Sequence, residues 1–376
     1  MACLPVDRAG FVALAFRGDL RETAAPPIRR SPRLGVFPIL LPSSQSSGDL
    51  VADRRAAYAR ALAERGDFAA AVDLIEQALE LAPDWAPGWS LCGDFRLASE
   101  DRAGAVSAWM KLAELDPTGI FGAPLKLAAH GAMRPIVETS QGYVAALFDE
   151  YAARFETDLH VALHYTVPER LAGLITAEMA RRGSSRLGLA LDLGCGTGLM
   201  GERLRRHVSY LAGTDLSAGM VAEADRKRIY DRLATDELRS FLGEQGAPAA
   251  DLIAAADVFC YCGALAPIFA SVAARLAPDG LFAFSLERHA GPEPHVVRPS
   301  LRIAHSAEAT RAALAEAGLE VVTWQDAPLR LDRGEPVDGL LVLVVRPAAA
   351  QSVVDAAAPV VAQDAAPDPE PAPSIH

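Results

Sequence analysis

The chain has 376 residues, a formal net charge of −12 at pH 7 and a hydrophobic fraction of 51%. This composition excludes a wholly disordered protein and leaves room for two domains with tails. The negative charge disfavours generic binding to nucleic acid, because the phosphate backbone would be repelled.

The cysteines and the apolar runs indicate a reduced, cytoplasmic protein. Of the five cysteines, Cys260 and Cys262 form the only close pair in the sequence, with one residue between them. This spacing predicts neither a zinc site nor a disulfide framework, so we expect no metal in the functional site. The apolar runs are too short for a membrane span or a convincing secretory signal, and we expect a cytoplasmic location.

Both ends of the chain are expected to be disordered. Residues 1–50 form a leader that mixes Pro, Ser and Arg without a sustained period, and residues 347–376 form a tail rich in Ala, Pro and Asp. Neither stretch carries enough bulky apolar surface to fold by itself.

A repeat with an offset of 34 residues follows the leader. When GDFAAAVDLIEQALELAP is aligned on EDRAGAVSAWMKLAELDP, Ala71 falls on Ala105 and Pro83 falls on Pro117. This is the period of tetratricopeptide repeats, in which small residues let paired helices approach closely. We therefore expect a small all-α domain over residues 52–135, with about four helices and a packing helix, that serves packing or the binding of a protein partner.

From residue 143 onward, apolar strands alternate with amphipathic helices. Two helical segments, YVAALFDEYAARFETDL and VPERLAGLITAEMARRG, precede the first strand. The expected strands are LGLALDLG, YLAGTDL, DLIAAADVF, LFAFSLE, LEVVTWQD and GLLVLVV. This rhythm predicts an α/β fold with a doubly wound, mainly parallel sheet. Ligands of such sheets bind beyond the carboxyl ends of the strands, at the switch point.

The loop after the first strand, LDLGCGTGLMG, is compatible with two kinds of ligand. GTGLMG fits the dinucleotide pattern G-x-G-x-x-G, whereas DLGCGTG fits an acidic residue followed by alternate glycines. Gly194, Gly196 and Gly198 allow positive φ and a close approach of the backbone in either case. Asp192 favours a positively charged ligand, directly or through water, because its carboxylate would repel a pyrophosphate.

Three more acidic residues follow later strands. Asp215 ends the second strand in GTDLS, where a carboxylate can accept both hydroxyls of a ribose and so predicts an adenosine ligand. Asp236 follows a short strand-like segment and either receives the adenine amino group or caps the next helix. Asp257 ends DLIAAADVF and is expected to border the cofactor or the substrate.

Within residues 143–346, four stretches resemble, in order and spacing, the motifs of class I S-adenosylmethionine-dependent methyltransferases. They are LDLGCGTG, GTDLS, DLIAAADVF and LAPDGLFAFSLE. With the repeats, the chain is similar to predicted bacterial methyltransferases that contain tetratricopeptide repeats. The resemblance implies a Rossmann-like, seven-stranded sheet whose last strand, DGLLVLVV, runs antiparallel, and S-adenosyl-L-methionine as the methyl donor. It places cofactor binding on Asp192, Gly194, Cys195, Gly196 and Gly198 in the loop, on Asp215 and Leu216 for the ribose, on Asp236 and Glu237 for adenine, and on Asp257.

A general base is optional for methyl transfer, because the sulfonium donor is already reactive. His305 in RIAHS is the first candidate for such a catalytic base, ahead of His289, His295 and Tyr261. A loop histidine is more often an ordinary surface residue, and that interpretation stays open for His305.

Tyr151 and Phe155 resemble the aromatic residues that cover the cofactor in related enzymes. Their spacing of four residues suits plain helix packing equally well, so both interpretations stay open.

A small molecule is the expected methyl acceptor, with a protein held by the repeats as the second possibility. A DNA-modifying enzyme of the amino-methylating kind would carry an (Asp/Asn)-Pro-Pro-(Tyr/Phe) turn where this chain reads Asp257-Val258-Phe259-Cys260. With the negative charge, this absence argues against a nucleic acid acceptor. Two other functions stay open: a nicotinamide-dependent oxidoreductase, and a repeat-based interaction scaffold whose second domain only senses the cofactor.

Overall fold

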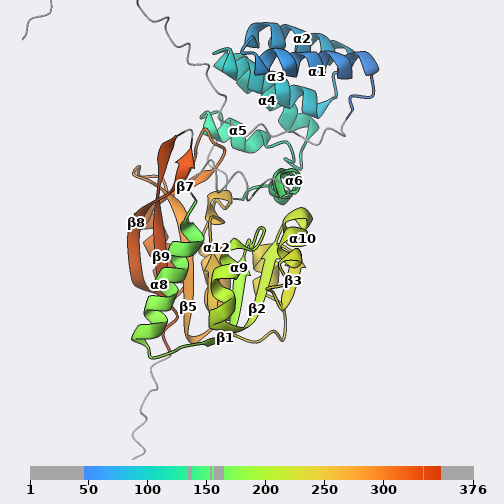
Figure 1. Ribbon diagram of the computed structural model, residues 1–376. Helices are drawn as coiled ribbons and strands as arrows, with labels where there is room; N and C mark the ends of the chain where they lie inside the picture. The colour runs from blue at the N-terminus through green and yellow to red at the C-terminus, as the bar shows by residue number, and fades with distance from the viewer. Residues whose placement is uncertain (1–45, 134–137, 153–154, 156–164, 333, 349–376) are drawn as a thin grey trace, which may run out of the picture. The chain divides into compact units, whose positions relative to one another are not determined.

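The computed structural model describes residues 46–133, 138–152, 155, 165–332 and 334–348 (Figure 1). The segments expected to be disordered at the two ends lie mostly outside these residues, as does the end of the helical segment that begins at Tyr143. The described part contains a group of helices followed by an α/β sheet.

Helices in antiparallel pairs occupy the first described segment. The helices are α1 (Leu50–Glu64), α2 (Phe68–Leu81), α3 (Ala86–Ala98), α4 (Arg102–Leu115) and α5 (Ala123–Ala129). α1 packs on α2, and α3 packs on α4. Asp67 caps α2 and Asp101 caps α4, each by accepting a hydrogen bond from a backbone N–H in the first turn. The two caps are 34 residues apart, which is the offset seen in the sequence.

Small residues let these helices approach one another. Ala52, Ala56 and Ala59 of α1 are fully buried in the same cluster as Ala71 of α2. In the second pair, Gly93 lies directly against the buried side chain of Trp109. A Cβ added at Gly93 would lie only 2.2 Å from the indole nitrogen.

The sheet follows the expected doubly wound pattern. Its parallel strands lie in the order β3 (Arg232–Thr235), β2 (Val208–Asp215), β1 (Leu187–Leu193), β4 (Ala250–Ala255) and β5 (Leu276–His289). β9 (Glu335–Val345) runs antiparallel to β5, as expected for DGLLVLVV, and β8 (Glu320–Asp332) pairs with β9. The order of the strands reverses between β1 and β4, so the switch point lies at the carboxyl end of β1.

The described sheet has nine strands, so the expectation of seven was wrong. β7 (Ile303–Ser306) runs parallel to the last residues of β5, and β6 (His295–Val297) runs antiparallel to β7. The reason is the length of β5, which spans 14 residues and continues beyond the end of β4. β7 pairs with the end of β5 that extends beyond β4, on the same edge.

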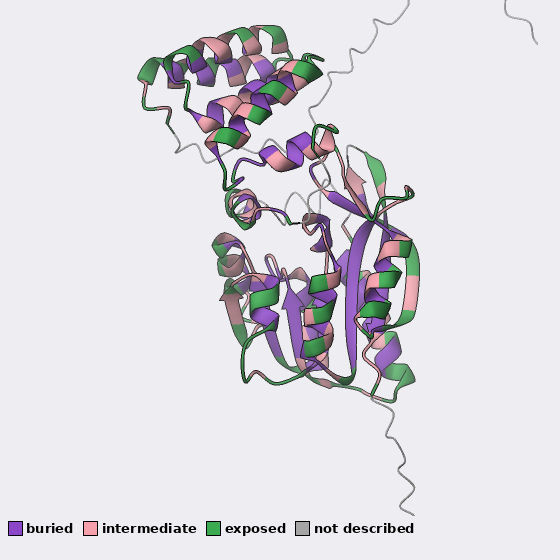
Figure 2. Cartoon of the chain, turned by 180° about the vertical axis from the view of Figure 1, so that it is seen from behind, coloured by how far each residue is buried: buried purple, intermediate pink, exposed green. Residues whose placement is uncertain are grey.

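Helices cover both faces of the sheet. They are α8 (Val167–Arg181), α9 (Leu199–Leu204), α10 (Ala218–Arg226), α11 (Leu238–Leu242), α12 (Ala266–Arg275) and α13 (Ala307–Glu316). Because side chains alternate along a strand, Phe282 and Phe284 of β5 face one apolar cluster and Leu281 and Ala283 face the other. Figure 2 shows the resulting buried central strands. Within the described helices, none combines the length and apolar character that crossing a membrane requires.

Candidate functional site

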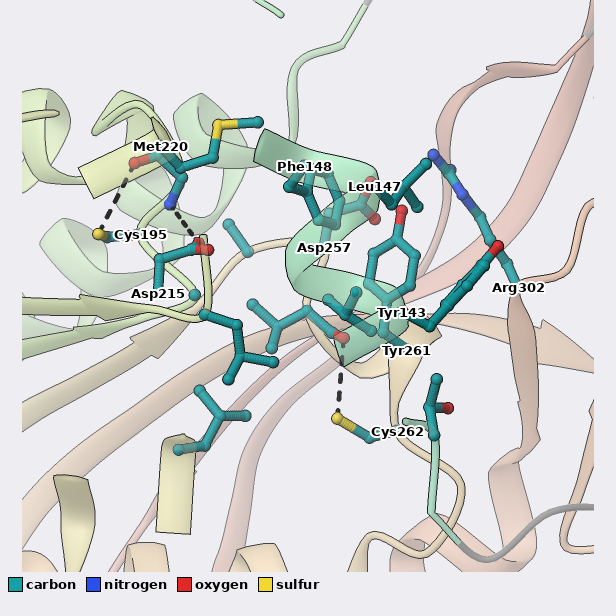
Figure 3. Close-up of a pocket in the computed structure, with 18 of the residues that line it drawn as sticks. Tyr143, Leu147, Phe148, Cys195, Asp215, Met220, Asp257, Tyr261, Cys262 and Arg302 are labelled. Carbon is teal, nitrogen blue, oxygen red and sulfur yellow. Dashed lines mark hydrogen bonds between the residues drawn. The ribbon is translucent and has the colours of Figure 1, made fainter. Parts of the chain in front are cut away.

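A cavity of about 460 Å³ lies at the carboxyl ends of the central strands (Figure 3). The loop after β1, the end of β2 and the segment after β4 form one part of its wall. Another part comes from α6 (Gln141–Tyr151), which precedes the sheet in the sequence. The cavity thus occupies the place where doubly wound sheets bind their ligands.

The glycine loop between β1 and α9 turns on three positive φ angles. Gly194, Gly196 and Gly198 have φ of 59°, 52° and 95°, which side-chain-bearing residues rarely adopt. A Cβ added at Gly194 would lie 2.6 Å from the side chain of Val258. A Cβ added at Gly196 would have its nearest described neighbour 4.0 Å away, in the side chain of Phe155. Gly194 therefore leaves room for the side chain of Val258, Gly196 brings bare backbone to the cavity, and both residues line it.

Asp215 at the end of β2 is oriented through both carboxylate oxygens. The backbone N–H of Gly196 donates to Oδ2 at 2.9 Å, and that of Ser217 donates to Oδ1 at 2.9 Å. Burial raises the pKa of Asp215, while these two hydrogen bonds oppose the rise. Each oxygen keeps accepting capacity, so the half-buried group can receive the two hydroxyls of a vicinal diol. Leu216, the next residue, also lines the cavity.

Asp192 lies beneath the loop and outside the described wall of the cavity, contrary to the expected role next to a ligand. Its side chain is 1% exposed, Oδ2 accepts a hydrogen bond of 2.6 Å from the hydroxyl of Tyr230, and Oδ1 has no hydrogen-bond partner among the described residues. Burial raises the pKa of Asp192 to about 7. The physical reason is strand alternation, because Leu191 and Leu193 face one layer and Asp192 faces the other.

Tyr230 reaches Asp192 through a slot that glycines leave open. A Cβ added at Gly201, Gly213 or Gly198 would lie 2.2, 2.9 or 3.2 Å, respectively, from the side chain of Tyr230. The later glycines of the G-x-G-x-x-G pattern therefore make room for a tyrosine ring of the protein itself. Sequence reasoning missed Tyr230, because it is 38 residues from Asp192 and belongs to no motif.

Asp236 and Glu237 differ in their relation to the cavity. Asp236 accepts hydrogen bonds from the Glu237 backbone N–H at 2.8 Å and from the Ser240 hydroxyl at 3.0 Å, and it does not line the described cavity. Asp236 therefore makes local contacts beside the start of α11, but the residue that caps this helix is Glu237. Glu237 lines the cavity and caps α11 by accepting from the backbone N–H groups of Arg239 and Ser240.

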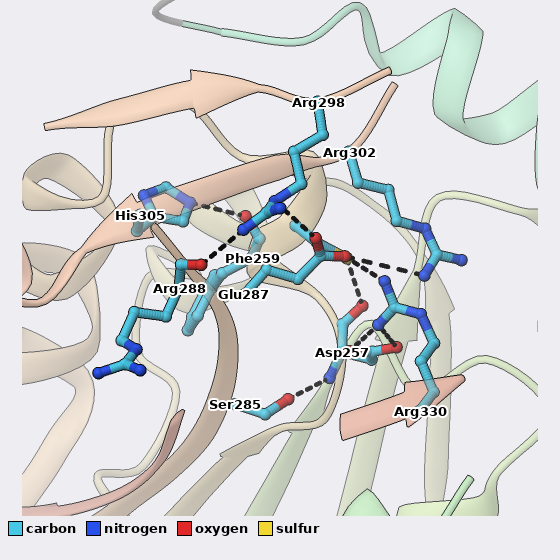
Figure 4. A network of polar contacts seen from close by, with 10 residues as sticks. Asp257, Phe259, Ser285, Glu287, Arg288, Arg298, Arg302, His305 and Arg330 are labelled. Atoms are coloured by element: carbon cyan, nitrogen blue, oxygen red, sulfur yellow. Dashed lines mark hydrogen bonds and ion pairs between the residues drawn. The ribbon is translucent and has the colours of Figure 1, made fainter. Parts of the chain in front are cut away.

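Asp257 belongs to a group of charged residues that we call the arginine cluster (Figure 4). Arg330 donates to both carboxylate oxygens of Asp257, at 3.0 and 2.8 Å, and also to Glu287. Arg298 and Arg302 approach Glu287 at 3.6 and 3.9 Å. Asp257, Arg302 and Arg330 line the cavity, and the carboxylate of Asp257 is already paired with Arg330. The three arginines were missed, because they are spread over two strand-loop segments.

His305 does not line the described cavity, which argues against its expected role as a catalytic base. The ring is 2% exposed, and Nε2 donates to the carbonyl of Phe259 at 3.0 Å, since a carbonyl can only accept. Burial lowers its pKa to about 4. His305 in β7 therefore stays neutral near pH 7. Its ring nitrogens are buried and do not reach the wall of the described cavity. His289 and His295 also lie off this wall, whereas Tyr261 lines it.

The aromatic residues expected near the cofactor line the cavity together. Tyr151 of α6 packs against Phe155 edge to face, with ring centroids 5.5 Å apart. α6 is tied to the start of α10 by Asp149, whose Oδ1 accepts from the Ser217 hydroxyl at 2.6 Å and from the Gly219 N–H at 2.9 Å. This link holds the helix next to the loop that follows β2.

Solved structures of methyltransferases are similar to this chain at low sequence identity. An S-adenosylmethionine-dependent methyltransferase from Clostridium acetobutylicum is 17% identical, with a TM-score of 0.41 and coverage of 54% of this chain and 99% of that one. The magnesium protoporphyrin IX methyltransferase of Synechocystis is 16% identical, with a TM-score of 0.42 and coverage of 55% and 99%. The N-methyltransferase NodS of Bradyrhizobium japonicum is 22% identical, with a TM-score of 0.39 and coverage of 48% and 87%. These similarities carry no argument about the acceptor of this chain.

The sequence itself matches a known family over the centre of the sheet. A comparison with curated proteins gave no significant match. Residues 191–282, however, match the family described as a methyltransferase domain, and this stretch contains the glycine loop and Asp215. The match confirms the methyltransferase part of the resemblance and the expected cofactor, S-adenosyl-L-methionine, and does not extend to the repeats. The chain therefore contains a methyltransferase domain, with S-adenosyl-L-methionine as its methyl donor.

Proposed function

We propose that this enzyme methylates a small-molecule acceptor bound in the cavity between the loop after β1 and α6. The observation that carries the proposal is the placement of Asp215, a carboxylate aimed by two backbone N–H donors into a cavity that bare glycine backbone also reaches. A volume of about 460 Å³ is in the range of small-molecule sites.

The residues of the cavity fit the cofactor chemically. The oxygens of Asp215 suit the hydroxyls of a ribose, and the open space at Gly196 suits close contact with backbone. Leu216 and Leu238 offer apolar surface for a base, and Glu237 offers an acceptor for an amino group. We assign these residues, with Gly194, Cys195 and Tyr151, to cofactor binding.

The chain contributes alignment and the exclusion of water to the reaction. When bound, the cofactor supplies an electrophilic methyl group on a positively charged sulfur. Tyr151, Phe148 and Phe155 form an aromatic wall that keeps water away and is compatible with a cation. Alignment of an acceptor for in-line attack is worth up to about 7 to 11 kcal/mol.

We assign no general base. His305 is buried away from the described cavity wall. Burial raises the pKa of Tyr261, so its hydroxyl stays protonated near pH 7 and acts as a hydrogen-bond donor. An acceptor atom that already carries a free lone pair at neutral pH suits such a site.

We further propose that α1–α5 form a domain of the tetratricopeptide type over residues 52–135, separate from a catalytic domain over residues 143–346. The offset of 34 residues between the caps of α2 and α4 supports this assignment. A role in packing or in binding a protein partner follows from the same comparison.

Calorimetric titration of the full chain tests the proposal. We expect S-adenosylhomocysteine to bind and NAD to give no heat of binding. Incubation with S-adenosylmethionine labelled in the methyl group and a panel of metabolites should then place the label on a small molecule. Binding of NAD in preference to S-adenosylhomocysteine, or label recovered only in protein or nucleic acid, would refute it.

A further inference from the structure

The arginine cluster holds more positive than negative groups. Arg298, Arg302 and Arg330 surround two carboxylates, Asp257 and Glu287 (Figure 4). Arginine stays charged at all working pH values. Within this cluster of described residues, one guanidinium charge is left over beside the cavity.

The three arginines differ in how completely they are paired. Arg330 is the most fully paired, because one nitrogen meets both oxygens of Asp257 and another meets Glu287. Arg298 donates to the carbonyl of Arg288 at 2.6 Å and is turned toward Glu287. Glu287 is thus shared, and its distance to Arg302, 3.9 Å, is the longest of the three.

Within this cluster, Arg302 is both the most loosely paired arginine and a residue of the cavity wall. Its side chain is 18% exposed, and Figure 3 shows it on the opposite side of the pocket from Asp215. Asp215 marks the proposed cofactor end, so Arg302 marks the end left for the acceptor. The guanidinium carries five N–H donors in a planar fork that matches the geometry of a carboxylate.

Apolar and aromatic residues line the cavity beside Arg302. Its guanidinium lies 5.8 Å from the ring centroid of Tyr261, and Tyr143, Leu147 and Leu301 complete this part of the wall. An ion pair formed here is poorly screened by water, so a ligand charge of the right sign gains more than at an open surface.

We propose that Arg302 binds a carboxylate of the methyl acceptor, so that the substrate class is a small monocarboxylic acid with a mainly apolar body, whose separate nucleophilic atom lies at the cofactor end and accepts the methyl group. This inference rests on the proposed small-molecule function. One carboxylate balances the one excess positive charge of the arginine cluster, whereas a phosphate dianion would leave an excess negative charge there. The apolar body of the acid would pack against Tyr143, Leu147 and Leu301.

The test uses the full chain saturated with S-adenosylhomocysteine and titrated with 3-phenylpropionate, octanoate and their neutral amides. We expect at least one acid to bind about tenfold or more tightly than its amide, because a charge-assisted pair is lost in the amide. Arg302→Gln should abolish this preference, and Arg302→Lys should restore part of it. Arg288→Gln is the matched control, since Arg288 pairs with Asp326 and does not line the described cavity.

The controls separate the two proposals. A wild-type chain that fails to bind S-adenosylhomocysteine contradicts the proposed function and this inference with it. A chain that binds S-adenosylhomocysteine but treats acids and amides alike, or prefers phenyl phosphate to the acids, overturns only the inference. The same holds if the preference for acids persists in Arg302→Gln, whose affinity for S-adenosylhomocysteine should equal that of the wild type.

Discussion

The hydroxyl of Tyr230 donates a hydrogen bond of 2.6 Å to Asp192 at the end of β1, so the acidic residue of the glycine-loop motif is engaged by the protein itself. Tyr230 fills the space left by Gly198, Gly201 and Gly213. The contact therefore joins β1 and the start of α9 to the segment before β3. Asp192 supports the loop from below, while Asp215 faces the cavity.

The buried Asp192 predicts a pH-dependent stability. Its folded-state pKa of about 7 lies above the ordinary 3.8, so between these values the folded chain binds more protons than the unfolded chain. The contribution of Asp192 to the free energy of unfolding should fall as the pH rises from 4 to 7. Asp192→Asn should remove this slope in urea unfolding curves of the full chain. A difference between wild type and variant that stays constant across this range would contradict the assignment.

Much of the fold was predictable because strand periodicity and glycine spacing are local signals. Asp215 was found because it ends a recognisable strand at a fixed distance from Gly198. The extra strands β6 and β7 were not found, because three- and four-residue strands have no clear period and depend on the free edge of β5. Long-range packing is equally invisible in a sequence, which is why Tyr230 and Arg302 were missed and the burial of His305 was not predicted.

Asp215→Ala should weaken the binding of S-adenosylhomocysteine. Each charge-assisted hydrogen bond lost to a ribose hydroxyl costs about 1.5 to 3 kcal/mol, so we expect the dissociation constant to rise by about tenfold or more in calorimetry. Asp215 also receives two backbone hydrogen bonds, so Asp215→Asn, which keeps one carbonyl acceptor, checks for damage to the loop. Glu244→Gln is the matched control, because Glu244 pairs with Arg232 outside the cavity wall. An unchanged dissociation constant in Asp215→Ala would remove this residue from the cofactor site.

Two alanine substitutions in the glycine loop should have different effects. Both positions have positive φ, which costs an alanine roughly 1 to 2 kcal/mol. Gly196→Ala also directs a methyl group toward the cavity, so the loss of affinity for S-adenosylhomocysteine should exceed the loss of stability. Gly194→Ala places the methyl 2.6 Å from Val258, so the melting temperature should fall more in this variant. Equal affinities in the wild type and Gly196→Ala would show that the loop does not contact the cofactor.

His305→Gln should leave methyl transfer nearly intact and change the acid stability of the chain. His305 is bound to the Phe259 carbonyl away from the described cavity wall, and glutamine keeps an N–H donor for that carbonyl. The folded-state pKa of about 4 lies below the ordinary 6.5, so between these values the unfolded chain binds more protons and wild-type stability falls as the pH is lowered. The variant should lack this part of the fall in unfolding experiments between pH 6.5 and 4. A loss of kcat by several orders of magnitude, with unchanged stability and cofactor affinity, would instead restore His305 as the general base.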